Sequence, residues 1–187
     1  MVLWLNNLNF FEQRKNQRES LANKNYDLLL LNCQAITANK CDILYTDILQ
    51  EYGKIKFLCL TETCCTVTNV EAVHIQGYKL AASFSRKNCK GGGVGIWCAT
   101  DLSVNALNLN LSEHCVEKHF EICGISWSFE EKKIFLFTSY RSPDSDIQIF
   151  YNNIGIILDL YFKRNNYFIL AVTLILIQNA IKNNLST

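Results

Sequence analysis

A single carboxylate, Glu62, follows a short apolar segment and is placed to contact a ligand. Residues 57–60 read Phe-Leu-Cys-Leu, which is typical of a buried strand, and Glu62 lies between Thr61 and Thr63 at its carboxyl end. Ionised Glu is rarely buried without a partner, but a carboxylate at the end of a strand in an α/β sheet faces the crevice where ligands usually bind. The alternative is a solvated Glu where strand becomes loop, and Glu62 taken alone favours that alternative.

The elements before Glu62 predict that Asn32 lies beside it. Residues 26–33 (YDLLLLNC) are typical of a buried strand that ends near Asn32, and residues 39–52 have helical spacing. Asn39 is the expected helix cap, with Gly53 as the stop signal. A strand–helix–strand unit implies parallel neighbouring strands with a right-handed crossover. Both strands then end at the same edge of the sheet, where Asn32 and Glu62 are side by side.

The middle of the chain predicts antiparallel strands. Residues 73–82 and 94–98 are expected strands around a polar turn at 85–93. The glycines at 91–93 lack the Gly-Lys-Ser/Thr ending and the following helix of a phosphate-binding loop, so a hairpin turn is the better interpretation. Further strands are expected at 102–111, 120–127 and 133–140.

The last part of the chain predicts a helix and a final strand. Pro143 stops the strand that ends at Tyr140. Ser145 and Gln148 form the signature of a capping box, and apolar residues then keep helical spacing from Ile147 to Tyr161. Residues 167–177 are an eleven-residue apolar run that predicts a fully buried strand.

Composition indicates one globular domain without a strong charge. The 187 residues are 49% apolar and 19% charged, and the net charge is +1, so no global field directs the chain to nucleic acid or membrane. Contact with phosphate would need a local basic cluster, at 14–18, 86–90 or 163–164, and each cluster alone is typical of a solvated surface. We expect residues 1–25 to be a poorly ordered leader or frayed helix and residues 26–187 to form the domain.

The cysteines and the apolar runs indicate an intracellular protein. There are nine cysteines and no C-x-x-C pair, so neither a zinc knuckle nor a complete disulfide framework fits, and free thiols suit a reducing compartment. A membrane-spanning helix needs about 20 apolar residues, more than the longest run supplies. The N-terminus has no signal-peptide pattern. We therefore expect no membrane association and a location in the nucleus or cytoplasm.

Five features in order carry a resemblance to a known family. They are Asn32 with Gln34, Glu62, Gly77-Tyr78 followed by Ser85-Arg86, GGGVGIW at 91–97, and YRSP at 140–143. This set resembles the endonuclease/exonuclease/phosphatase superfamily, and most closely the endonuclease domain of non-LTR retrotransposons, over residues 26–177. The resemblance implies an α/β fold, a four-layer sandwich of two mixed β-sheets flanked by helices.

The resemblance also implies an activity and its residues. The family hydrolyses phosphodiester bonds with a divalent metal, usually Mg²⁺, and Glu62 matches the metal-binding acid because hard cations prefer carboxylate oxygen. Asn32 matches an amide near metal and phosphate, and Tyr140 a hydroxyl that reaches a phosphate oxygen. Without the family pattern, Asn32 would be a turn residue and Tyr140 an aromatic residue at the core edge. DNA is the implied partner, and the residues expected to contact it are Arg86, Lys87, Lys90 and Arg141.

The chain departs from the family pattern in its last third. Val172, Thr173 and Ile175 stand where the family has the Gly, Asp and Asn of a Gly-Asp-x-Asn motif. The Asp–His pair expected further on has no counterpart, and His74, His114 and His119 match nothing catalytic. We therefore expect a truncated, degenerate endonuclease domain with its C-terminal part missing, an incomplete Mg²⁺ site and weak or no activity.

Two readings follow from these departures. One is a weak or inactive retrotransposon-derived DNA endonuclease. The alternative is a non-catalytic remnant that acts at most as a nucleic-acid or protein binding module. The missing part would also leave residues 167–177 as an uncovered sheet edge, through which the chain could self-associate.

Overall fold

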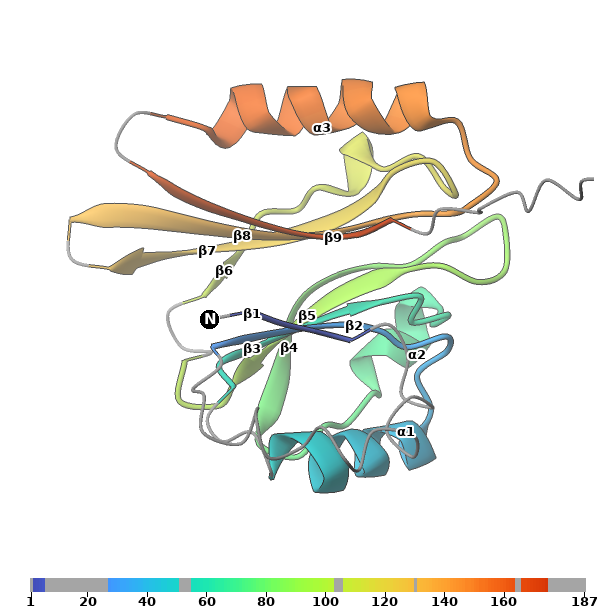
Figure 1. The fold of residues 1–187 in the computed structure, drawn as a ribbon, viewed down its shortest axis with the longest axis vertical. Coiled ribbons are helices and arrows are strands. Elements are labelled where there is room, and N and C mark those ends of the chain that lie inside the picture. Colours follow the sequence, from blue (N-terminus) through green and yellow to red (C-terminus); the bar gives the residue numbers. More distant parts are fainter. Residues whose placement is uncertain are drawn as a thin grey trace, which may run out of the picture.

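Two β-sheets pack face to face, with helices on their outer faces (Figure 1). The computed structural model describes residues 2–5, 27–50, 55–102, 106–129, 131–163 and 166–174. The first sheet has the strand order β1-β2-β3-β5-β4 and the second has the order β6-β7-β8-β9. Both sheets are mixed, because each contains parallel and antiparallel pairs. The predicted four-layer α/β fold is confirmed.

The strands of the first sheet are β1 (Val2–Leu5), β2 (Leu28–Asn32), β3 (Phe57–Thr61), β4 (Tyr78–Phe84) and β5 (Val94–Ala99). Those of the second are β6 (Leu107–Asn108), β7 (Glu121–Phe129), β8 (Lys132–Arg141) and β9 (Tyr167–Leu174). The helices are α1 (Ala38–Ile43), continued by a π-helical stretch at Leu44–Leu49, then α2 (Val67–Glu71) and α3 (Ile147–Tyr161), with a 3₁₀ turn at Ser112–His114.

The strand–helix–strand unit forms as the sequence predicts. Strands β2 and β3 run parallel with Asn32 opposite Thr61, and α1 connects them on the outer face of the first sheet (Figure 1). Every residue of both strands is buried, which explains their continuous apolar character. Because the parallel strands end together, the side chains that follow them meet at one edge of the sheet.

Three apolar layers hold the sandwich together. One lies between the first sheet and α1, one lies between the sheets, and one lies under α3. The layer between the sheets contains Leu30 and Ile96 from the first sheet and Ile125 and Leu136 from the second. Tyr140 belongs to this layer, so its side chain points from β8 toward the first sheet.

The prediction of a poorly ordered leader or frayed helix over residues 1–25 is wrong in part. Val2–Leu5 forms strand β1 and pairs in parallel with Leu28–Leu31 of β2. Residues 6–26, which include the basic cluster at 14–18, lie outside the described residues, and so does the predicted helix stop at Gly53.

Both predicted helix caps are displaced. The N-cap of α1 is Thr37 and not Asn39, because the Thr37 hydroxyl accepts a hydrogen bond from the Lys40 amide at 3.3 Å. The N-cap of α3 is Asp146 and not Ser145, since the Asp146 carboxylate accepts from the Gln148 amide at 2.7 Å. The Ser145 hydroxyl instead donates to the Ser142 carbonyl at 2.6 Å, so it is not free to cap the helix.

Strand ends differ where the backbone turns. β3 ends at Thr61, directly before Glu62, and both Glu62 and Cys64 have positive φ. β4 begins at Tyr78, after Gly77 with φ of +82°, and the strand expected over 102–111 is reduced to Leu107–Asn108.

The last strand, β9, is not fully buried as predicted. Tyr167 and Ile169 are 50% and 36% exposed, whereas Phe168, Leu170 and Val172 pack under α3. In the described part of the chain β9 is the edge strand of the second sheet, beyond β8.

None of the described helices is long and apolar enough to cross a membrane.

Candidate active site

The three predicted site residues lie together at the carboxyl edge of the first sheet. Glu62 Oε1 accepts hydrogen bonds from Asn32 Nδ2 at 3.2 Å and from the Tyr140 hydroxyl at 2.7 Å. Asn32 and Tyr140 are only 3% and 4% exposed, while Glu62 is half-buried. Asn32 and Glu62 come from the first sheet and Tyr140 from the second, so the cluster joins both sheets.

The orientation of the Asn32 amide is fixed by a turn. The Gln34 backbone amide donates to Asn32 Oδ1 at 3.2 Å, so the Nδ2 donor points to Glu62. Burial, followed by the hydrogen bond to Glu62, raises the pKa of Tyr140, because both favour the neutral phenol. Tyr140 therefore remains a hydrogen-bond donor at neutral pH.

The backbone around Glu62 is strained. Six described non-glycine residues have positive φ, and four of them adjoin the cluster, namely Gln34, Ala35, Glu62 and Cys64. Positive φ is uncommon for non-glycine residues, costs on the order of 1–3 kcal/mol each, and gathers at functional sites. The loops that follow β2 and β3 hold each other in this conformation, since Ala35 N donates to Glu62 O at 2.8 Å. Strain concentrated on a carboxylate at a sheet edge supports a functional role.

The glycine-rich hairpin supports the Glu62 loop. Thr63 N donates to Gly93 O at 3.2 Å, and Cys64 N donates to Gly92 O at 2.7 Å. Gly93 has φ of +84°, and a Cβ there would lie 2.7 Å from Thr63 Oγ1, so only glycine fits. Strands β4 and β5 pair antiparallel, which confirms the predicted hairpin. The glycines therefore hold the loop that carries Glu62.

Thr173 lies close to the cluster. The Thr61 hydroxyl donates to Thr173 Oγ1 at 3.0 Å, between β3 and β9, and both residues are buried. Thr173 is the residue that stands where the resemblance would place an Asp. Its hydroxyl is used to join the two sheets.

One oxygen of the Glu62 carboxylate is open to a cation. Glu62 Oε1 has two donors, while Oε2 receives no hydrogen bond from the described residues. Mg²⁺ is commonly held by one or two carboxylates, several waters and substrate phosphates. The described residues contain no group of three or more His, Cys, Asp or Glu that could hold a metal. Among the described residues, this cluster therefore offers the carboxylate of Glu62 to a cation.

Two of the four predicted nucleic-acid contacts are buried. The Arg86 side chain is 6% exposed and pairs with Glu121, and Arg141 is 6% exposed and donates to the Ser145 carbonyl at 2.6 Å. Both guanidinium groups are used within the protein, so the expected patch of four does not form. Lys87 and Lys90 are exposed, and the prediction stays open for them.

Glu121 is the polar residue that sequence reasoning missed. It is fully buried at the start of β7 and contacts Arg86 and the Gly93 amide. A carboxylate beside the apolar segment Ile122–Ile125 is the same signal that singled out Glu62, and it could have been found in that way. The histidines are elsewhere: His119 Nδ1 accepts from the Asp146 amide, and His74 is exposed.

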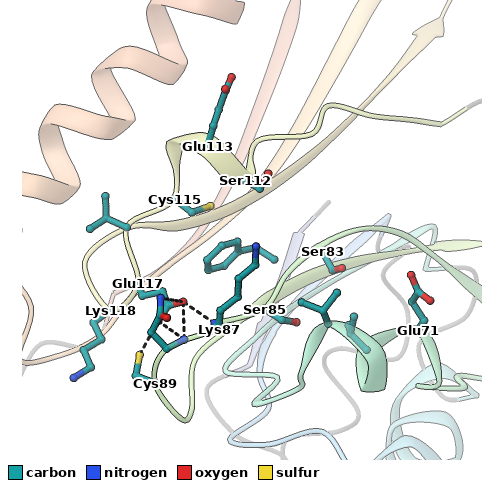
Figure 2. A pocket seen from close by; sticks show the side chains of 15 residues that line it. Glu71, Ser83, Ser85, Lys87, Cys89, Ser112, Glu113, Cys115, Glu117 and Lys118 are labelled. Carbon is teal, nitrogen blue, oxygen red and sulfur yellow. Dashed lines mark hydrogen bonds between the residues drawn. The ribbon is translucent and has the colours of Figure 1, made fainter.

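An open groove of about 1000 Å³ lies away from this cluster (Figure 2). Its walls come from α2, from β4 and the loop after it, and from residues 112–118. None of Asn32, Glu62 and Tyr140 lines it. On one side, Glu117 accepts hydrogen bonds from the amides of Lys87 and Asn88 (Figure 2).

Comparison with known proteins gives similarity of fold alone. No family model matches the chain, and no curated protein matches it. The endonuclease domain of TRAS1, a telomere-specific non-LTR retrotransposon, aligns with 15% identity and a TM-score of 0.46 over 89% of this chain and 56% of that one. D. rerio TDP2 complexed with single-strand DNA product aligns with 12% identity and a TM-score of 0.49 over 91% of this chain and 58% of that one.

Humanized D. rerio TDP2 aligns with 12% identity and a TM-score of 0.47 over 91% of this chain. The chain spans 56–60% of the length of these three structures. What it does must therefore be inferred from its own side chains.

Proposed function

We propose that the chain carries the site of a divalent-metal-dependent phosphodiester hydrolase of the DNA endonuclease class, with weak activity. The observation that supports this proposal is the Asn32–Glu62–Tyr140 cluster. Two polar side chains, one from each sheet, converge on one carboxylate, and the backbone that carries the carboxylate is strained.

Each residue has a distinct role in this proposal. Glu62 would hold Mg²⁺ through the oxygen that its neighbours leave open. When bound, the metal stabilises negative charge on the phosphate. Asn32 holds the carboxylate in one orientation. Tyr140 keeps its proton and offers it to a phosphate oxygen when substrate displaces the bond to Glu62.

A second candidate is a non-catalytic binding module, and the bond between Thr61 and Thr173 favours it. A threonine hydroxyl cannot act as a carboxylate base, and a missing general base lowers a rate by about 10²–10⁴-fold. The cluster could then hold a cation and a phosphate group without turnover.

Nicking of supercoiled plasmid DNA separates the two candidates. The hydrolase predicts Mg²⁺-dependent nicking that Glu62→Gln abolishes and that Glu117→Gln, a matched substitution outside the cluster, leaves intact. Equal background nicking by the wild-type chain and Glu62→Gln would reject the hydrolase. Line broadening by Mn²⁺ of amide signals near Glu62, lost in Glu62→Gln, would then identify a cation-binding module.

We further propose weak DNA contact through Lys87 and Lys90, the exposed members of the expected patch.

We also propose a reducing location, in the nucleus or cytoplasm. All nine cysteines lie in the described part of the chain and none forms a disulfide there, which supports this proposal.

Self-association is proposed at the β9 edge, with a second copy as the partner. Tyr167 and Ile169 expose apolar surface there, and edge strands pair readily with other chains. Sedimentation over a range of concentrations tests this, and Ile169→Lys is expected to weaken the association. A wild-type chain that stays monomeric throughout would exclude it.

A further inference from the structure

We infer that Arg86 and Glu121 form a positioning pair for the Glu62 loop. Only the expected effect of this pair on activity rests on the proposed function, and its effect on the Glu62 loop does not. Arg86 follows β4 in the first sheet, and Glu121 begins β7 in the second. Arg86 Nε and Nη2 both approach Glu121 Oε1 at 2.5 Å, and the two side chains are 6% and 0% exposed. The pair is thus a buried ionic link between the sheets.

The remaining donors and acceptors of the pair are also satisfied. Arg86 Nη2 donates to Ser142 Oγ at 2.7 Å, and Nη1 donates to the Lys90 carbonyl at 3.1 Å. Glu121 Oε2 accepts from the Gly93 amide at 2.6 Å, and Oε1 accepts from the Lys118 amide at 2.9 Å. A buried ion pair is tolerated when such hydrogen bonds complete it, and removal of one partner leaves an uncompensated charge.

One branch of this network leads to Glu62. Glu121 binds the Gly93 amide, and the carbonyls of Gly93 and Gly92 accept the amides of Thr63 and Cys64. A Cβ on Gly92 would lie 2.3 Å from the Arg86 guanidinium, so this loop packs directly on the pair. The pair therefore supports the two residues that follow Glu62.

The other branch leads to Tyr140. Ser142, which accepts from Arg86, lies two residues after Tyr140 on the same strand end. One ion pair thus fixes both the Glu62 loop of the first sheet and the strand end that holds Tyr140 in the second. The 2.7 Å bond between Tyr140 and Glu62 depends on both positions.

Glu117 provides a matched control. It lies four residues before Glu121 and also accepts backbone amides from the β4–β5 loop, but from Lys87 and Asn88. It has no hydrogen bond to the Gly92–Gly93 segment among the described residues. Glu117→Gln should therefore loosen residues 87–89 without reaching Glu62.

Amide hydrogen exchange tests the inference without requiring activity. In Glu121→Gln we expect the amides of Thr63 and Cys64 to exchange at least about tenfold faster, while core amides such as Leu58 keep their protection relative to global unfolding. In Glu117→Gln the amides of Thr63 and Cys64 should be unchanged. Ser142→Ala removes one contact of Arg86 without unpairing a buried charge, and a smaller change of the same kind is expected.

Activity gives an independent readout. If the wild-type chain nicks DNA, Glu121→Gln should raise the Mg²⁺ concentration for half-maximal nicking and lower kcat, with KM for DNA unchanged. If it does not nick DNA, the proposed hydrolase fails but the exchange result still decides the positioning role. If Glu121→Gln does not fold, amide exchange in Ser142→Ala tests the positioning role instead. Unchanged exchange at Thr63 and Cys64 in a folded variant would overturn the inference.

Discussion

The carboxylates of Glu62 and Glu117 both accept hydrogen bonds, but from different kinds of donor. Glu62 receives them from the buried side chains of Asn32 and Tyr140, which belong to different sheets. Glu117 receives them mainly from backbone amides at a hairpin tip beside the open groove (Figure 2). Glu117 is used to hold a loop, whereas Glu62 keeps one oxygen open at the meeting point of two sheets.

The difference shows that the open groove and the cluster of converging polar side chains do not coincide. The groove of about 1000 Å³ is lined by Glu117, but strain and converging side chains are found at Glu62. Burial opposes ionisation of Glu117, but hydrogen bonds from the Lys87 amide, the Cys89 thiol and the Asn88 amide hold its pKa below the usual value. Glu117 is therefore a charged loop anchor at neutral pH.

The largest expected effect is the loss of the buried charge pair. Arg86→Met leaves Glu121 buried without its cation, and breaking a buried pair typically costs about 3–5 kcal/mol. Glu117→Gln, at the half-buried hairpin tip, keeps an acceptor oxygen and should lower the free energy of unfolding by only about 0.5–1.5 kcal/mol. Urea denaturation followed by circular dichroism measures both. Equal losses in the two variants would mean that buried and surface anchors do not differ.

A smaller effect separates charged from neutral acceptors. Tyr140→Phe removes a hydrogen bond to a carboxylate and should cost about 1.5–3 kcal/mol. Tyr78→Phe is the matched control, since its hydroxyl donates to the Ile55 carbonyl at 2.6 Å, and it should cost about 0.5–1.5 kcal/mol. A cost for Tyr140→Phe no greater than the control would show that Glu62 does not hold Tyr140 as a charged group.

The sequence was sufficient to predict that Asn32 and Glu62 share an edge. Their positions follow from two continuous apolar strands joined by a helix, and parallel strands end on the same side. The arrival of Tyr140 from the second sheet came only from the resemblance, because no local pattern records how two sheets face one another. The hairpin at 85–93 was predictable because its glycines and flanking strands are local signals.

The burial of the Arg86 and Arg141 side chains could not be predicted from the sequence. Arg86 lies in a basic cluster that is typical of a solvated face, and its burial depends on Glu121, 35 residues away and in the other sheet.

The helix caps were misplaced for a local reason. Thr37 and Asn39, like Ser145 and Asp146, are all good caps, and at α3 the Ser145 hydroxyl is already bonded to the Ser142 carbonyl.

Alkaline titration sharpens the same contrast. Burial raises the pKa of Tyr78 to about 12, and burial with the Glu62 bond raises that of Tyr140 further in the same direction. In the unfolded chain both ionise near 10, so their contribution to stability is complete below pH 10 and is lost as pH rises through the folded values. Stability measured from pH 9 to 12 should fall, and less steeply in Tyr140→Phe.

Absorbance of ionised tyrosine gives the control. Tyr140→Phe should remove a component that ionises above the range of free tyrosine, because burial and the bond to Glu62 raise the pKa of Tyr140. If Tyr140→Phe instead removes a component within the range of free tyrosine, the Tyr140 hydroxyl does not lie buried against Glu62.

The smallest expected effect concerns DNA contact at the hairpin tip near Glu117. Each phosphate contact contributes about 0.9 to the slope of log affinity against log salt concentration, so Lys87→Gln with Lys90→Gln should lower that slope by up to about 1.8. Lys79→Gln, an exposed lysine on β4, controls for net charge. Because Arg86 and Arg141 are held inside the protein, only the two lysines of the expected four residues are left to contribute to the salt dependence. An unchanged slope in the double variant would move DNA contact away from the hairpin tip and leave this region as a loop anchor alone.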